Sequence, residues 1–301
     1  MALQECGLNL NNVSKELRPH GSVEFPCAGY ASHHTEREED VIPWHWHDEL
    51  EIVYIKQGQM KIRTSSGSFL MQKGDLLMIN SNILHSGTAV MECDLRSLVF
   101  SPVLITGNAD SAFAKKYIDP LLSCHSFSAY PIPAGSNEAL SDWFRHAFET
   151  IKNDSYGFEF SVRENLSRML LFCCEKFETH MDTKAAPLDL DNLRIQKMLG
   201  FLHAHFADNL SLREISDAAD ISERECLRCF QKTIQLSPIQ YLLKYRVMQG
   251  AKMLLDSPAS SISEIAISCG FDSPSNFART FRRFYNYTPR EYRKKHLSIT
   301  A

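Results

Sequence analysis

The sequence predicts an α+β protein with several domains: an N-terminal β-barrel followed by helices, then an all-α C-terminal domain with a tandem helix-turn-helix. Three observations predict this architecture. Residues 41–105 contain short apolar runs separated by turn residues, which is typical of a small barrel or sandwich. From about residue 110 the apolar residues recur at helical spacing. Beyond Pro187, two segments about fifty residues apart resemble each other, and each carries helix-start signals.

Charge is distributed unevenly along the chain. The 301 residues are enough for two folding units of roughly 150 residues each, and an apolar content of 44% allows hydrophobic cores. Residues 1–187 hold 16 Lys and Arg against 24 Asp and Glu, whereas residues 188–301 hold 16 against 12. An acidic first part and a basic second part indicate different partners, and the basic part suits nucleic acid.

The composition is that of a cytoplasmic protein. No basic head followed by an apolar run opens the sequence, so we expect no signal peptide. The densest apolar stretch, Leu166–Cys174, is far shorter than the ~20 residues that span a membrane, so no membrane partner is expected. The 9 cysteines are irregularly spaced, which favours reduced thiols. We expect Cys226 and Cys229 to pack within a helix rather than to bind zinc.

The first hundred residues divide into an arm and a barrel. We expect residues 1–40 to form an arm or loop with at most short strands, and residues 41–105 to form the barrel core. Strands are predicted at 51–55, 60–64, 69–71, 76–79 and 95–100. Turn residues separate them at Gly58–Gln59, at Ser65–Ser68 and at Lys73–Asp75.

Residues 106–182 are predicted to be a helical region. Two apolar helical faces are Leu140, Phe144, Ala147, Phe148 and Ile151, and Leu166, Met169, Leu170, Cys173 and Phe177. Such amphipathic helices either dimerise or pack on the barrel of their own chain, and both alternatives stay open, with a homodimer preferred. We expect a linker at 183–190 and only helices in the domain 191–301.

The C-terminal domain contains two helix-turn-helix units. Each unit opens on a capping box and carries a second cap before its second helix. The capping boxes pair Ser211 with Glu214 and Ser261 with Glu264, and the second caps are Ser222 and Ser273. Between the units, residues 238–255 are predicted to form one helix, about 27 Å long at 1.5 Å per residue. A spacer of this length suits two recognition helices placed one DNA turn apart.

The second helix of each unit has the surface of a DNA-reading helix. Cys226, Cys229 and Phe230 are expected to face inward in the first helix, as Phe277 and Phe281 do in the second. The outward residues are expected to bind DNA: Arg224, Glu225, Leu227, Arg228 and Lys232, then Ser275, Asn276, Arg279, Arg282 and Arg283. Arg and Asn pair bidentately with guanine and adenine edges, and the remaining cations suit phosphates. The alternative, an ordinary basic helical bundle, does not call for two such units in tandem.

This domain closely resembles the double helix-turn-helix domain of the AraC/XylS family of transcription regulators. The resemblance covers about 100 residues and is most specific at Gly270-Phe271, along Phe277–Arg283 and along Thr288–Arg293. It implies that six residues lie at the DNA: Arg224, Leu227 and Arg228 in the first unit, and Ser275, Asn276 and Arg279 in the second.

The chain departs from the family pattern at three positions. Gln235 and Asn286 stand where the family usually has glycine after each recognition helix. Because Gln adopts the left-handed conformation less readily than Asn, we expect the first helix to end differently. Leu227 is apolar at a usually polar position, which points either to contact with a thymine methyl group or to weaker base reading by the first unit.

The N-terminal domain resembles the cupin double motif, so a cupin-like barrel is expected. His45, His47 and Glu51 match the first half of the motif, and His85 matches the second half, in which Asn80 and Asn82 replace proline and glycine. In metal-binding cupins the positions of His45, His47, Glu51 and His85 hold the ion, and imidazoles with a carboxylate suit first-row divalent metals. Three interpretations stay open: a metal site, an effector pocket lined by these residues and Trp46, or structural hydrogen bonding. The effector pocket is preferred, and no cofactor is assigned.

The sequence therefore predicts a cytoplasmic, sequence-specific transcription regulator, more often an activator than a repressor in this family. Its expected partners are double-stranded promoter DNA, a small-molecule effector, RNA polymerase and a second copy of the chain. Binding of the effector would shift the equilibrium between DNA-binding arrangements. The alternative is a metal-dependent cupin enzyme fused to a DNA-binding domain, with the His45 set as a Lewis-acid centre.

Overall fold

The computed structural model describes residues 3–4, 8, 10–11, 14–17, 19–181 and 190–297. The chain forms two compact units. The first contains most of residues 1–192, and the second contains residues 193–301 with two short N-terminal pieces. The division lies close to the predicted start of the C-terminal domain at residue 191. The predicted linker lies outside the described residues except for Leu190, where a helix begins.

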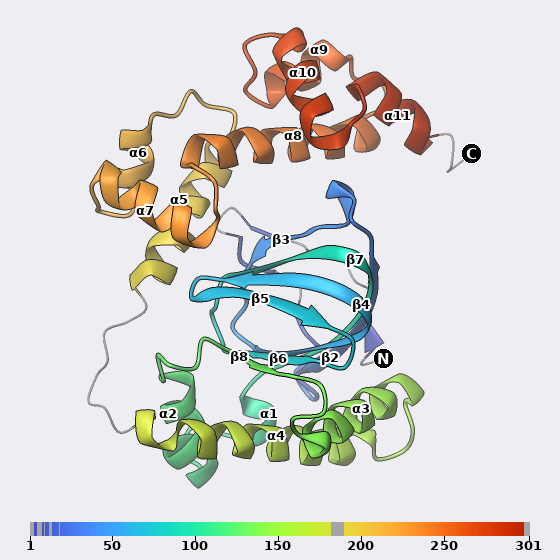
Figure 1. Ribbon diagram of the computed structural model, residues 1–301, viewed down its shortest axis with the longest axis vertical. Helices are drawn as coiled ribbons and strands as arrows, with labels where there is room; N and C mark the ends of the chain where they lie inside the picture. Colours follow the sequence, from blue (N-terminus) through green and yellow to red (C-terminus); the bar gives the residue numbers. More distant parts are fainter. Residues whose placement is uncertain are drawn as a thin grey trace. The chain divides into compact units, whose positions relative to one another are not determined.

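One eight-stranded sheet forms the centre of the first unit (Figure 1). The strands are β1 (Leu3–Gln4), β2 (Cys27–His34), β3 (Ile42–His45), β4 (Leu50–Thr64), β5 (Gly67–Gln72), β6 (Leu76–Ile79), β7 (His85–Phe100) and β8 (Ala129–Ile132). Their order is β1-β2-β7-β4-β6-β8, with β3 on β7 and β5 on β4. The β1–β2 pair is parallel and the others are antiparallel, so the sheet is mixed. Because this order does not return to its start among the described strands, the predicted barrel is an open one.

The two long strands β4 and β7 divide the sheet into halves. The first part of β4 pairs with β6 and its second part pairs with β5. Likewise, β7 begins against β3 and ends against β2. Side chains of both halves then pack together in one apolar cluster that includes Val53, Ile55, Met60, Met71 and Leu95. The halves therefore face each other across a shared interior, as in a sandwich.

Gly58 lies within a strand, so the turn predicted at Gly58–Gln59 was wrong. β4 continues from Leu50 to Thr64, with irregular register against β7 around this residue. Gly58 has φ +80°, and a Cβ atom there would lie 1.8 Å from the carbonyl oxygen of Glu92. The glycine thus allows a bulge that bends β4 from one half of the sheet into the other.

Helices α3 and α4 cover the outer face of the first half of the sheet (Figure 1). The helices of this unit are α1 (Val103–Thr106), the π-helix η2 (Ala114–Ile118), α2 (Asp119–Leu122), α3 (Glu138–Asn153) and α4 (Phe158–Met181), and the short 3-10 helix η1 spans Glu38–Asp40. Both predicted apolar faces are buried, and residues such as Phe144 and Leu166 join Ile52 and Phe100 in one core. Of the two alternatives for these faces, packing on the sheet of the same chain is the one that the structure contains.

Two strands of four or more residues lie outside the predicted barrel core of 41–105. β2 occupies eight residues of the predicted arm and pairs with β7 along its whole length. β8 lies in the predicted helical region and pairs with β6 at the edge of the sheet. Pro131, within β8, has no amide hydrogen for a ladder and is typical of an edge strand. The sheet domain thus extends well beyond 41–105 on both sides.

The second unit is entirely helical in its described residues (Figure 1). Its helices are α5 (Leu190–Ala204), α6 (Leu212–Asp217), α7 (Glu223–Thr233), α8 (Pro238–Asp256), α9 (Ile262–Ser268), α10 (Pro274–Tyr285) and α11 (Pro289–Leu297). The predicted caps are confirmed: Ser211 and Ser261 form capping boxes with Glu214 and Glu264, and Ser222 and Ser273 cap α7 and α10. Helix α8 is the predicted spacer, with 19 residues, and it contacts α6, α7, α9 and α10.

The two helix-turn-helix units repeat each other in backbone detail. Asp220 and Gly270 occupy the same place in the two turns, with φ +55° and +75°. The next amide in each turn donates to a carbonyl five residues back, from Ile221 to Ser216 at 3.2 Å and from Phe271 to Ala266 at 3.0 Å. The repeat that the sequence suggested is therefore a repeat of structure.

Both recognition helices are followed by a left-handed residue, but α7 ends one residue earlier in its unit than α10 and with a different last hydrogen bond, in agreement with the expectation for Gln235. Gln235 has φ +62° and Asn286 has φ +58°, so both adopt the left-handed conformation that glycine favours. The amide of Gln235 donates to the carbonyl of Phe230 at 3.0 Å, which ends α7. The hydrogen bond and the burial of Phe230 outweigh the conformational cost of a non-glycine residue.

Candidate DNA-binding surface and histidine cluster

Helix α7 separates its apolar and polar residues as predicted. Cys226, Cys229 and Phe230 are fully buried. Of the predicted DNA-contacting residues of α7, Arg224, Leu227, Arg228 and Lys232 are exposed, and Glu225 is half-buried. Leu227 is 42% exposed, so a large part of this apolar side chain faces outward between the polar residues of α7.

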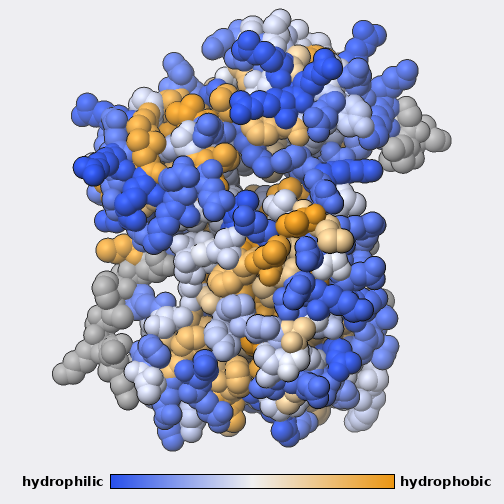
Figure 2. Space-filling view, viewed as in Figure 1, coloured by the Kyte–Doolittle hydropathy of each residue, from blue (hydrophilic) through white to orange (hydrophobic). Residues whose placement is uncertain are grey.

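Helix α10 has the same arrangement with a more basic surface. Phe277 and Phe281 are fully buried against α8 and α9 residues. The predicted DNA-contacting residues of α10 are Ser275, Arg279, Arg282 and Arg283, which are exposed, and Asn276, which is half-buried. Hydrophilic side chains cover most of the visible surface of α9, α10 and α11 (Figure 2). Three arginines on one exposed helix face form a concentrated positive charge that suits a polyanion.

The two recognition helices differ in the acid beside their arginines. On α7, Glu225 accepts hydrogen bonds from Arg228 at 2.8 and 2.9 Å and one from Arg194 of α5 at 3.0 Å. On α10, Arg279 donates to the neutral amide oxygen of Asn276 at 3.1 Å. The positive charge of α7 is therefore partly neutralised within the folded unit, whereas that of α10 keeps its strength.

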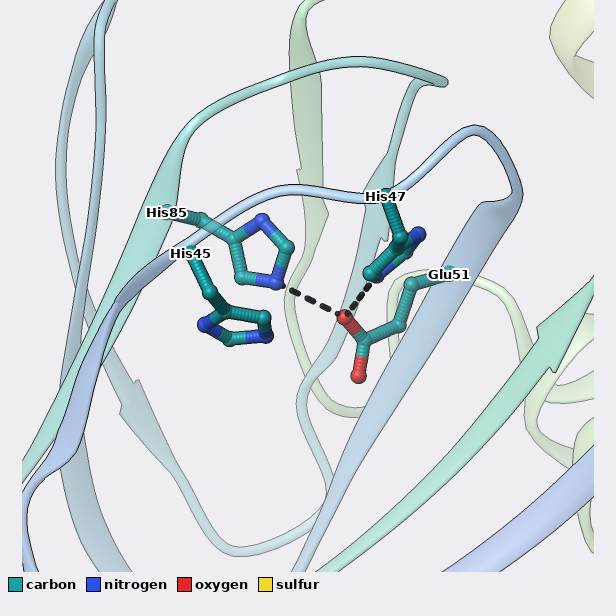
Figure 3. Close-up of side chains that lie close together, drawn as sticks. All are labelled: His45, His47, Glu51 and His85. Atoms are coloured by element: carbon teal, nitrogen blue, oxygen red, sulfur yellow. Dashed lines mark ion pairs between the residues drawn. The ribbon is translucent and has the colours of Figure 1, made fainter. Parts of the chain in front are cut away.

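A second candidate site lies inside the sheet domain, where four buried side chains converge (Figure 3). His45 ends β3, His85 begins β7 opposite it, Glu51 lies near the start of β4, and His47 follows β3. A carboxylate oxygen of Glu51 lies 3.1 Å from Nε2 of His85 and 3.5 Å from Nε2 of His47. One potential ligand atom from each of the four residues lies within 4.8 Å of the others. The sequence thus predicted the members of this cluster correctly.

The backbone fixes the orientation of all three imidazoles. Nδ1 of His45 lies 2.9 Å from the carbonyl of Pro43, Nδ1 of His85 lies 2.8 Å from that of Ile83, and Nδ1 of His47 lies 3.2 Å from that of Glu49. Because a carbonyl only accepts, each Nδ1 carries a hydrogen, and each Nε2 is the ring nitrogen left for another partner. Nε2 of His47 and of His85 is buried and completes no hydrogen bond in its present geometry.

The charge states of the cluster follow from burial and mutual contact. Burial, reinforced by the nearby His85 and His47, holds the pKa of His45 well below its usual range, so this ring is neutral. Burial alone would raise the pKa of Glu51, but its contacts with His47 and His85 outweigh burial and lower that pKa well below normal. Burial opposes protonation of His85, yet Glu51 raises the pKa of His85 overall. A divalent metal binds the carboxylate and the deprotonated Nε2 of an imidazole, so metal binding would release any proton held at Nε2 of His85.

The distances from Glu51 are close to those between donors that share one first-row divalent ion. Two donor atoms bound at about 2.0–2.1 Å to one ion lie roughly 3.0–3.4 Å apart. The separation of 3.1 Å between Glu51 and His85 falls in this range, and that of 3.5 Å between Glu51 and His47 is slightly longer. Backbone carbonyls on the outer nitrogens are the second-shell contacts that metal-binding histidines usually have.

Sequence reasoning missed the residues that surround this cluster. His20 is buried, and its ring centroid lies 5.1 Å from that of His47. Nδ1 of His20 lies 2.7 Å from the hydroxyl of Tyr30, and Nε2 lies 3.5 Å from a carboxylate oxygen of Glu16. Because these residues belong to a segment without periodicity or motif, no signal in the sequence connected them to His47.

Trp46, a predicted pocket residue, is not part of the cluster. Its ring is half-buried, and the ammonium of Lys15 lies 5.0 Å from its centroid. Lys15 also pairs with Asp48 at 2.5 Å. A cation–π contact thus occupies this ring. Stacking of Trp46 on a ligand stays a prediction without support from its position.

Within the described residues, no helix has the length and apolarity needed to cross a membrane.

A sheet domain with a buried polar site, followed by two helix-turn-helix units with exposed arginines, defines the class of protein: a DNA-binding regulator with a ligand-binding domain.

Comparison with known proteins agrees with this class. Residues 29–172 match the model of the AraC-like ligand binding domain, and residues 215–295 match that of a helix-turn-helix domain. The uncharacterized HTH-type transcriptional regulator YdeC of Bacillus subtilis is 27% identical over 286 residues, 93% of this chain and 96% of YdeC. The HTH-type transcriptional activator RhaS of Klebsiella pneumoniae is 24% identical over 85% of this chain and 89% of RhaS. A crystal structure of ToxT from Vibrio cholerae with bound unsaturated fatty acid has a TM-score of 0.44 at 12% identity, covering 89% of this chain and 94% of that one.

The chain is a transcription regulator of the AraC family, with an AraC-like ligand-binding domain before its helix-turn-helix domain. This confirms the predicted family, fold class and regulatory function. The family consists of regulators and not of enzymes, so the alternative of a cupin enzyme has no support.

Proposed function

We propose that this regulator reads operator DNA through the exposed faces of α7 and α10, and that a divalent transition metal ion is the ligand of its sheet domain. The observation that carries the first part is the repeated helix-turn-helix in which Arg228 and Arg279 occupy the same exposed helical position. The observation that carries the second part is the convergence of four buried donor side chains within 4.8 Å.

The side-chain chemistry of α7 and α10 determines which residues contact bases and which contact phosphates. Arg228, Asn276 and Arg279 contact base edges, since Arg and Asn make bidentate pairs with guanine and adenine. Leu227 contacts a thymine methyl group. The remaining predicted residues serve as phosphate contacts or hold their neighbours: Arg224, Glu225, Lys232, Ser275, Arg282 and Arg283.

The test is binding of the purified chain to its own upstream region and to random duplex DNA of equal length. Arg228→Ala and Arg279→Ala should each weaken specific binding by about 1–3 kcal/mol and leave binding to random DNA less affected. Arg213→Ala is the matched control, since Arg213 is an exposed arginine of α6 outside both recognition helices. Equal losses on both DNAs for Arg228→Ala or Arg279→Ala would show phosphate contacts and overturn the base-reading assignment.

In the sheet domain, His45, His47, Glu51 and His85 would hold the ion. Imidazole nitrogens with one carboxylate suit Zn²⁺, Ni²⁺, Co²⁺ and Fe²⁺. The bound ion would supply positive charge at the junction of the two sheet halves and draw the donors from β3, β4 and β7 together. An ion regulates DNA binding only through a difference in affinity between two states, and couplings of roughly 5–150-fold are usual.

Metal binding is tested by equilibrium dialysis of the metal-stripped chain against Zn²⁺, Ni²⁺, Co²⁺ and Fe²⁺, with metal content and thermal unfolding as readouts. We expect one ion per chain, and a free-ion concentration of 100 times Kd should stabilise the fold by about 2.7 kcal/mol. His85→Ala and Glu51→Gln should abolish both effects. His33→Ala, which removes an exposed imidazole of β2, should change neither. If the wild-type chain retains no ion, an organic effector becomes the candidate ligand.

We further propose that the regulator is a cytoplasmic homodimer that activates transcription in contact with RNA polymerase. The relative RhaS is a transcriptional activator, which supports activation as the direction of regulation. Exposed apolar residues on α4 support the dimer, and buried thiols such as Cys27 and Cys173 are compatible with a reducing compartment.

A further inference from the structure

Glu225 lies between two arginines from different helices. It accepts from Nε and Nη2 of Arg228, one turn further along α7, at 2.9 and 2.8 Å. It also accepts from Nη1 of Arg194, on α5, at 3.0 Å. The side chain of Glu225 is 31% exposed, against 47% for that of Arg228. Glu225 is thus hydrogen-bonded to α5 through Arg194 and holds Arg228 of α7 through two further hydrogen bonds.

The ion pair with Glu225 restricts how Arg228 can approach a base. A guanidinium is planar and makes bidentate contacts through one edge at a time. Because Glu225 engages the edge formed by Nε and Nη2, a bidentate contact to guanine has to use the edge formed by Nη1 and Nη2. The ion pair also fixes several rotatable bonds of a long side chain before DNA arrives, so less conformational freedom is lost on binding.

The equivalent pair on α10 is built differently. Counted from the capping serines, Asn276 corresponds to Glu225 and Arg279 corresponds to Arg228. There the contact is one hydrogen bond of 3.1 Å to a neutral amide. Asn276 can exchange this bond for a bidentate contact to adenine at little cost. Glu225 cannot, since leaving Arg194 and Arg228 would break three charge-assisted hydrogen bonds.

We infer that Glu225 is a positioning residue that holds Arg228 for end-on reading of a guanine, and that it does not itself contact a base. This inference rests on the proposed function of α7 as a DNA-reading helix. It replaces the expectation that Glu225 binds DNA directly. It also assigns a different kind of base contact to each unit. On α7, one arginine held by an ion pair contacts the base. On α10, an asparagine and an arginine each contact a base.

The test begins with selection of bound sequences from a pool of random duplex DNA by the full chain. The base positions that Arg228 reads are those at which the sequence preference disappears in Arg228→Lys. This variant keeps the positive charge but lacks the planar guanidinium that makes two parallel hydrogen bonds. Glu225→Gln is then compared with Glu223→Gln. Both remove one negative charge from the first turn of α7, but Glu223 lies five residues before Arg228, outside the i+3 and i+4 spacings at which side chains of one helix meet. The two variants therefore change the general attraction to phosphates alike.

We expect Glu225→Gln to lower the preference for guanine at the Arg228 position roughly tenfold, and Glu223→Gln to leave it unchanged. In the Arg228→Lys background, Glu225→Gln should have no further effect on that preference. Thermal unfolding of each variant checks that the α5–α7 contact has not been lost. Arg194→Gln provides a second check, because it removes that contact and keeps the pair of Glu225 with Arg228.

Three outcomes would overturn the inference. Glu225→Gln and Glu223→Gln would behave alike if Glu225 acted only through its charge. Loss of preference at a cytosine position, with the guanine preference intact, would show that Glu225 reads a base directly. An effect of Glu225→Gln that persists undiminished in Arg228→Lys would show that it does not act through Arg228. Failure of the wild-type chain to select any sequence would instead refute the proposed function itself.

Discussion

Burial decides the chemistry of individual histidines in this chain. His203 on α5 is buried, lies 2.8 Å from the hydroxyl of Tyr241 and stacks on Tyr245 with ring centroids 3.8 Å apart. Burial lowers the pKa of His203 to about 3. His205, one residue beyond the end of the same helix, is exposed and pairs with Asp208 at 3.1 Å. Two histidines of one segment therefore have different surroundings.

The depressed pKa of His203 predicts an acid-sensitive helical unit. In the unfolded chain this ring takes up a proton near its usual pKa of about 6.5, whereas the folded ring stays neutral down to about pH 3. The contribution of His203 is therefore complete above about pH 6.5 and is lost as pH falls through this window. Between pH 7.5 and 5.5 we expect a loss of roughly 1 kcal/mol in the free energy of unfolding.

Urea unfolding of the wild type, His203→Phe and His205→Gln at the two pH values checks this prediction. His203→Phe keeps a ring against Tyr245 and should reduce the pH dependence, while the exposed control His205→Gln should retain it. An equal dependence in wild type and His203→Phe would assign the acid sensitivity to other groups.

The histidine cluster marks how far single residues could be predicted. His45 and His47 were connected to Glu51 by short spacing along the chain, and to His85 by a motif. The contributions of Glu16 and His20 depend on where an irregular segment folds back, which no local pattern encodes. Likewise, the pairing of Glu225 with Arg194 joins α7 to α5, and the whole of α6 lies between them in the sequence, so only the structure reveals it.

At the scale of elements, the ends of the recognition helices carry a conformational cost. Gln235 adopts φ +62° after α7, in a region that costs most non-glycine residues about 1–2 kcal/mol. Asn286 occupies the same place after α10 with φ +58°, and asparagine tolerates this conformation better. The first unit is therefore the one that a glycine should stabilise more.

Gln235→Gly should raise the free energy of unfolding by about 0.5–1 kcal/mol, since it removes the strain and loses some of that gain to unfolded-state entropy. Asn286→Gly should give a smaller gain. Gln231→Gly, at an exposed position inside α7, should lower stability by about 1 kcal/mol and serves as the control. Thermal unfolding measures all three. A loss of stability in Gln235→Gly would mean that the Gln235 side chain makes contacts worth more than the strain.

Helix boundaries were the most predictable part of the fold, because their signals are local. Ser211 and Ser261 with their glutamates three residues on specify a helix start without help from distant residues. Strand boundaries depend on partners instead. β2 and β8 are strands because β7 and β6 pair with them, and their own sequences contain no clear alternation. Gly58 resembled a turn because a bulge and a turn use the same positive φ.

At the scale of the whole molecule, two apolar residues stay exposed on the otherwise mostly charged outer face of α4 after its inner face has packed on the sheet. Phe160 is 83% exposed and Leu171 is 50% exposed. Eleven residues separate them, which is close to three helical turns, so they lie on one stripe of the helix. The predicted dimer thus requires this outer stripe rather than the buried face that the sequence suggested.

If the proposed homodimer forms through this stripe, Leu171→Arg should convert it to a monomer, because a buried arginine without a partner at a symmetric helix contact meets a like charge from the second copy. Sedimentation velocity measures the change at micromolar concentration. Leu70→Arg is the control, since Leu70 of β5 is 62% exposed on a different element and should leave the dimer intact. The monomer should also lose the gain in affinity that two linked half-sites provide, while keeping the affinity of one chain for one half-site. A Leu171→Arg chain that still sediments as a dimer would place the interface elsewhere. A wild-type chain that sediments as a monomer would mean that α7 and α10 of a single chain bind both halves of one site.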